Sequence, residues 1–232
     1  MSPGELVGVT AVGVVVGVDL VSVPQAMTSR PMVAALVGGW LLGHPMIGLL
    51  AGAVLELFAL ETLPVGAARY PDWGPPAAAA GALLADGVRA DTVAGVWPGL
   101  IATVFMAALV AWLGGWSMQV LRRANGAAIR FQAARLERGD PRALVALQAG
   151  GFVRDVVRAA LLTLVALVPG GVLARALAAR WRGPASLAED ALLAVALGAA
   201  AWSAWRLFGH GVTRRWLLAG LAVGCAGALL WV

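Results

Sequence analysis

Long apolar runs alternate along the chain with shorter polar and basic segments. A transmembrane helix needs about 20 apolar residues, and the run Thr92–Met118 supplies 27 without a charge. Leu6–Val23 is a second candidate span, with Asp19 as its one acid. Four shorter apolar runs follow or intervene: Ala77–Leu84, Ala159–Ala174, Ala191–Trp205 and Trp216–Val232. Ala77–Leu84 is too short to span alone. The pattern predicts an all-α integral membrane protein.

Two apolar segments carry helix-breaking residues. Met32–Leu63 is 32 residues long, which is too long for one ordinary span, and Gly43-His44-Pro45 interrupts it. Pro169-Gly170-Gly171 interrupts the apolar run that ends at Ala174. We therefore expect a multi-span helical bundle with broken or re-entrant helices. Irregular backbone at membrane depth requires cover by protein or a water-filled cavity.

The composition supports a membrane location. Only 12% of the residues are charged and 61% are hydrophobic, whereas soluble domains carry about 25% charged residues. All 17 basic residues are arginine, and most of them lie between apolar runs. This distribution follows the positive-inside rule and does not indicate nucleic-acid binding.

The most basic segment predicts the orientation. Gln119–Arg142 holds six arginines against two acids, so we expect a cytoplasmic loop with a short helical stretch inside a single domain, residues 1–232. A single crossing by Ala159–Ala174 would then place the arginines of Arg175–Arg182 outside, against the rule. A hairpin built from Leu144–Ala174 would remove this conflict.

Polar side chains cluster in the first third of the chain, within or beside apolar sequence. A charge near the bilayer centre costs about 2.5–3.5 kcal/mol on insertion scales. Such groups usually face a bundle interior and often mark a substrate or ion path. The set comprises Asp19, Gln25, Arg30, His44, Glu56, Glu61 and Asp72.

The order of short motifs in this region resembles a known family. The chain reads Gln25-x-x-x-Ser29-Arg30-Pro31, then Gly43-His44-Pro45-x-x-Gly48, then Gly52-Ala53-x-Leu55-Glu56-Leu57, and closes with Val65-Gly66-Ala67 and Pro71-Asp72. This series is similar to the mannose/sorbose-type IIC subunit of the bacterial phosphoenolpyruvate-dependent sugar phosphotransferase system. The close resemblance covers about 55 residues, and Arg122–Arg158 is similar more loosely.

The resemblance implies a sugar-translocating subunit in the bacterial cytoplasmic membrane. Such a subunit would bind a hexose-like sugar that a partner IIB phosphorylates. Its expected partners are an IID-like membrane subunit and cytoplasmic IIA and IIB subunits, in an oligomeric assembly. We expect no catalytic residue, cofactor or metal. The predicted substrate-binding residues are Gln25, Arg30, Glu56 and Asp72.

Structural roles compete with these assignments. Arg30 suits a salt bridge, Glu56 a hydrogen bond between helices, and Asp72 a turn. Asp19 suits the cap of a broken helix. His44 stands where the family commonly has Asp, which leaves open a degenerate orphan protein with a regulatory or assembly role and no transport.

Overall fold

The computed structural model describes residues 1–23, 26–60, 70–89, 96–211 and 213–231. Over these residues the chain is helical, with no strand. The helices in chain order are α1 (Pro3–Asp19), α2 (Pro31–Leu41), α3 (Pro45–Ala59), α4 (Gly74–Arg89), α5 (Val96–Phe131), α6 (Ala133–Glu137), α7 (Pro141–Leu167), α8 (Pro169–Ala179), α9 (Ala185–Phe208) and α10 (Thr213–Trp231).

The predicted break at Gly43-His44-Pro45 is present between α2 and α3. Gly43 has a φ of +84°, in the left-handed region that glycine tolerates. The Gly43 N–H donates to the Trp40 carbonyl and the His44 N–H donates to the Gly39 carbonyl, which is the Schellman pattern for a helix end. Pro45 then starts α3 at a position where proline costs no hydrogen bond.

Helix α4 forms the centre of the bundle, although its apolar run is too short to predict a span. It packs against α1, α2, α3, α5 and α7. Every residue from Gly74 to Ala85 is buried. The run Ala77–Ala80 presents only methyl groups, and these allow neighbouring helices to approach closely. Helix α4 therefore forms the core of the protein, and the surrounding helices shield it from lipid.

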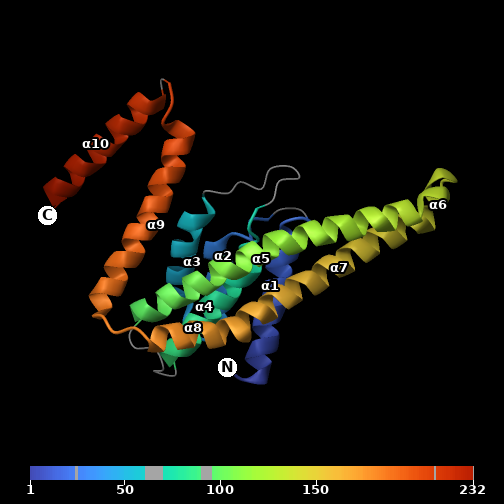
Figure 1. Ribbon diagram of the computed structural model, residues 1–232, viewed down its shortest axis with the longest axis horizontal. Helices are drawn as coiled ribbons and strands as arrows, with labels where there is room; N and C mark the ends of the chain where they lie inside the picture. The colour runs from blue at the N-terminus through green and yellow to red at the C-terminus, as the bar shows by residue number, and fades with distance from the viewer. Residues whose placement is uncertain (24–25, 61–69, 90–95, 212, 232) are drawn as a thin grey trace.

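The segment expected as a cytoplasmic loop is mostly helical. Helix α5 continues to Phe131, α6 forms a short tip, and α7 starts at Pro141, so that α5 and α7 run side by side as an arm beyond the bundle (Figure 1). Asp140 caps α7 by accepting from the Arg142 N–H. The Arg135 guanidinium, together with that N–H, holds the pKa of the Asp140 carboxyl below its usual value.

The hairpin considered for Leu144–Ala174 does not form. Helix α7 ends at Leu167 and α8 begins at Pro169, yet α8 continues away from the arm instead of turning back (Figure 1). The proline introduces a break without reversing the chain. Three apolar stretches in the described residues are long enough to cross a membrane: Val96–Phe131, Pro141–Ala179 and Ala185–Phe208. Helix α10 follows α9 at the side opposite the arm (Figure 1), and its described side chains are almost all exposed.

Candidate functional site

A buried cluster of charged side chains lies where the arm joins the bundle. The Arg158 guanidinium donates to Asp72 Oδ2 over 2.7 Å through Nη1 and to Asp155 Oδ1 over 2.9 Å through Nε. Ser22 Oγ donates to Asp155 Oδ2 over 2.5 Å. The side chains of Asp72, Asp155 and Arg158 are 1%, 0% and 7% exposed. Two carboxylates therefore share one guanidinium in the interior.

Small residues on α5 make room for this cluster. Residues 70–73 are not helical and lie against α5, where the Asp72 N–H donates to the Ala111 carbonyl over 2.9 Å. A Cβ at Gly114 would lie 2.7 Å from Asp72 Cβ, and one at Gly115 would overlap the Tyr70 carbonyl. The glycines thus let non-helical backbone pack against a membrane helix, where protein covers its polar groups.

The cluster is strongly bound but incompletely paired. Burial of an ion costs several kcal/mol, and loss of one partner from a buried pair typically costs about 3–5 kcal/mol. Asp72 Oδ1 and Arg158 Nη2 are both buried and have no hydrogen-bond partner in the described part of the chain. The cluster therefore keeps one unsatisfied acceptor and one unsatisfied donor, the two functions that a hydroxyl group combines.

A second ion pair joins the start of α2 to α3. Arg30 Nη2 contacts Glu56 Oε1, and the side chains are 33% and 15% exposed. Glu56 Oε2 also accepts from the Met32 N–H over 3.1 Å. This N–H is one of those that a helix N-terminus cannot satisfy internally, and the helix dipole favours a carboxylate there. Glu56 therefore caps α2 from the neighbouring helix.

Close packing surrounds this second pair. A Cβ at Gly52 would lie 2.7 Å from Met32 Cα. The backbone of α2 therefore leaves no room for a side chain at this position. Asp19 accepts from the Ala26 and Ser29 N–H groups over 2.7 and 3.0 Å. It thereby fixes the turn that leads to Arg30, whereas the expected role was the cap of a broken helix, and α2 has no side-chain cap at Arg30.

The structure distributes the predicted site residues over two groups. It brings Arg30 and Glu56 together, and it places Asp72 in the buried cluster. Gln25 lies outside the described residues. Their role in sugar binding stays a prediction.

Sequence reasoning missed Asp155 and Arg158. These residues have the i, i+3 spacing of a helical ion pair and directly precede the apolar run that starts at Ala159. This i, i+3 spacing at the edge of a membrane segment could have predicted the ion pair.

Two sequence comparisons with known proteins agree on one family. The sequence model described as "PTS system sorbose-specific iic component" matches residues 5–189. A sorbose-specific EIIC component of the same system from Lacticaseibacillus casei is 42% identical over 48 residues. This second match covers 21% of the chain and only 17% of the length of that relative.

Two solved structures have the same fold. One, described as a membrane protein, has a TM-score of 0.70 and 18% identity, over 99% of this chain and 94% of its own. The other is a mannose transporter, ManYZ, in complex with microcin E492. It has a TM-score of 0.58 and 18% identity, over 100% of this chain and 95% of its own. These likenesses support the multi-pass helical membrane fold.

Proposed function

We propose that this chain, which belongs to the sorbose-specific IIC family of the phosphotransferase system, is the sugar-translocating membrane subunit of such a permease. The observation that carries the proposal is the family match over residues 5–189. This range contains the Arg30–Glu56 pair, the buried Arg158 cluster and the broken helices. The substrate would be a hexose-like sugar, and the chain itself would perform no covalent chemistry.

The polar groups inside the bundle support a translocation role. Sugars are held by directional hydrogen bonds from carboxylates, amides and guanidinium groups. Asp72 and Arg158 each keep an unpaired buried atom, and such unsatisfied groups are costly unless a ligand or water serves them. Arg30 and Glu56 lie at the start of α2. This end of α2 is close to the segment that carries Asp72, because a Cβ at Gly74 would lie 3.4 Å from Ser29 Cα.

The partners follow from the same family membership. We expect an IID-like membrane subunit, and cytoplasmic IIA and IIB subunits that deliver the phosphoryl group, in the bacterial cytoplasmic membrane. The likeness in fold to the solved mannose transporter ManYZ supports this proposal of a membrane complex. Transport would then require all of these components together.

Uptake by the reconstituted complex tests the function. Proteoliposomes with this chain, its membrane partner and phosphorylated IIB should accumulate sugar phosphate. Glu56→Gln keeps the size and removes the charge, so it should lower uptake while leaving membrane insertion intact. Asp72→Asn should do the same, since Asp155 still neutralises Arg158.

Glu137→Gln, on the exposed tip of the arm, is the matched control and should leave uptake unchanged. Full uptake in both Glu56→Gln and Asp72→Asn would assign these carboxylates to structure alone. Absence of uptake by the unchanged complex would favour the orphan alternative.

His44 is the observation that bears on that alternative. It is the N-cap residue of α3, and its side chain makes no capping hydrogen bond. Asp is among the best N-cap residues, so the family's Asp has a structural explanation at this position. The replacement by His44 then costs helix stability and leaves the polar groups of the bundle unchanged. This interpretation favours retained transport.

A further inference from the structure

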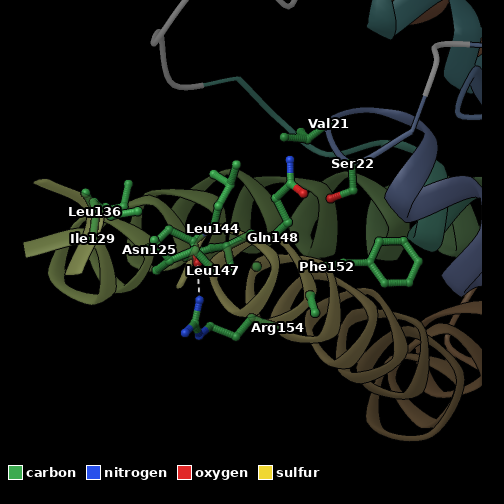
Figure 2. A pocket seen from close by; sticks show the side chains of 13 residues that line it. Val21, Ser22, Asn125, Ile129, Leu136, Leu144, Leu147, Gln148, Phe152 and Arg154 are labelled. Carbon is green, nitrogen blue, oxygen red and sulfur yellow. Dashed lines mark hydrogen bonds between the residues drawn. The ribbon is translucent and has the colours of Figure 1, made fainter. Parts of the chain in front are cut away.

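A groove of about 840 Å³ lies along the arm, apart from the buried ion pairs. Its walls come from α5, α6, α7 and the residues that follow α1 (Figure 2). Most lining side chains are apolar, and the polar exceptions are Ser22, Asn125, Gln148 and Arg154. A concave apolar surface with a few convergent polar groups is typical of small-molecule sites.

The groove lies beyond the membrane-crossing part of α5. Tryptophan favours the membrane–water interface, and Trp112 and Trp116 are both largely exposed. At about 1.5 Å per residue they lie roughly 24–30 Å from Val96, which is close to the thickness of the hydrocarbon. Every α5 residue of the groove follows Trp116. The groove is therefore accessible to a polar ligand from water.

The polar groups offer both donors and acceptors. Arg154 Nη1 donates to Asn125 Oδ1, which leaves the Asn125 NH₂ group to donate elsewhere. Ser22 spends its proton on Asp155, so its oxygen remains an acceptor. Gln148 is exposed, and its side chain makes no hydrogen bond in the described part of the chain. The side chain reaches toward Val21 and Ser22 (Figure 2).

We propose that this groove is a second binding site for a neutral polyhydroxylated compound of the sugar class, outside the membrane core. Hydroxyl groups donate and accept at once, and the groove presents two amides and a hydroxyl oxygen. Ser22 links the groove to Asp155, and Asp155 bonds Arg158. A sugar in the groove would therefore contact Ser22, which is hydrogen-bonded to the buried cluster through Asp155. This inference rests on the proposed transport function.

Protection of a thiol tests the site directly. In a chain with Cys225→Ala, Leu144→Cys places a reporter on the groove wall, one helical turn from Gln148. Val145→Cys is the matched control, because Val145 is exposed on the same helix but does not line the groove. The full-length protein in lipid nanodiscs is labelled with a maleimide, with and without mannose or sorbose.

We expect sugar to slow labelling of Leu144→Cys and not of Val145→Cys. Mass action predicts about a tenfold slowing at a sugar concentration about ten times Kd. Adding Gln148→Leu to the reporter should abolish the protection. Gly151→Leu should also abolish it, because a Cβ at Gly151 lies 3.8 Å from Asn125 Nδ2 and a longer side chain fills the groove. Leucine favours helices more than the glycine that it replaces, so α7 should remain intact.

The outcomes separate this inference from the transport proposal. Equal labelling with and without sugar, in a complex that transports, overturns the groove site alone. A reporter that does not react even without sugar shows that lipid fills the groove, and this also overturns the inference. Protection that survives Gln148→Leu and Gly151→Leu overturns it too. Protection without uptake supports the site and contradicts transport.

Discussion

At the residue scale, ion pairing explains why charged side chains stand in apolar sequence. Glu56 satisfies the start of α2 and pairs with Arg30, while Arg158 binds Asp72 and Asp155. Each buried charge thus has a partner, as the cost of unpaired ions in a low-dielectric interior requires. The unpaired atoms Asp72 Oδ1 and Arg158 Nη2 are the exceptions, and the proposed role of Asp72 in sugar binding rests on them.

A change at His44 tests the capping explanation of the family difference. His44→Asp should let a carboxylate accept from the first turn of α3 and stabilise the protein by about 0.5–2 kcal/mol. His44→Asn should give a similar gain without a charge, and His44→Ala should give none. Thermal unfolding in detergent measures all three. A rise in sugar uptake with Asp but not with Asn, at equal stability, would instead indicate a functional carboxylate.

At the element scale, small residues decide how closely the helices pack. A Cβ at Gly81 of α4 would overlap the Ala35 carbonyl of α2, and a Cβ at Gly38 of α2 would overlap the Ala78 carbonyl of α4. Because these neighbours are backbone atoms, they cannot move aside as a flexible side chain could. The close approach of α2 and α4 therefore depends on glycine, as is usual for helix contacts in membranes.

Substitution at Gly81 should show this dependence. Gly81→Ala forces α2 and α4 apart, so we expect destabilisation of roughly 1–3 kcal/mol from overpacking. Gly198→Ala in α9 is the control, because no atom lies within 4 Å of the Cβ it adds. That control should be neutral or slightly stabilising, since alanine favours helices. Equal melting temperatures for the two variants would contradict the packing argument.

At the scale of the whole molecule, the arm reaches out of the membrane. A helix of 36 residues such as α5 is about 54 Å long, well beyond the roughly 30 Å of hydrocarbon. The exposed Trp112 and Trp116 mark the level where α5 leaves the lipid. The remainder of α5, with α6 and the start of α7, carries the arginines of Gln119–Arg142. We therefore expect this arm in the cytoplasm.

Labelling from outside the cell tests the orientation. With Cys225 removed, a thiol at Ala133 in the tip should resist an impermeant maleimide in intact cells. A thiol at Gly183, in the exposed connection between α8 and α9, should react, since α7 and α8 continue across the membrane between the two positions. The reverse pattern would show that the arm faces outward and would also remove the cytoplasmic placement of the groove.

Local chemistry made much of the fold predictable from the sequence. Apolar runs and scarce charge predict membrane helices, because lipid requires satisfied backbone and tolerates few ions. Gly43 and Pro45 predict the break between α2 and α3 through their own φ restrictions. The motif order from Gln25 to Asp72 predicts the family, which the match over residues 5–189 confirms.

The tertiary structure decided what depends on distant partners. Asp72 meets Arg158 across 86 positions of sequence, and no periodicity encodes that pairing. Ala77–Leu84 is too short to span alone, yet it becomes the buried centre because other helices enclose it. Pro169 marks a break in sequence, but only packing against α5 sets the direction of α8. Local backbone preferences act within a few residues, whereas burial and ion pairing are properties of the assembled bundle.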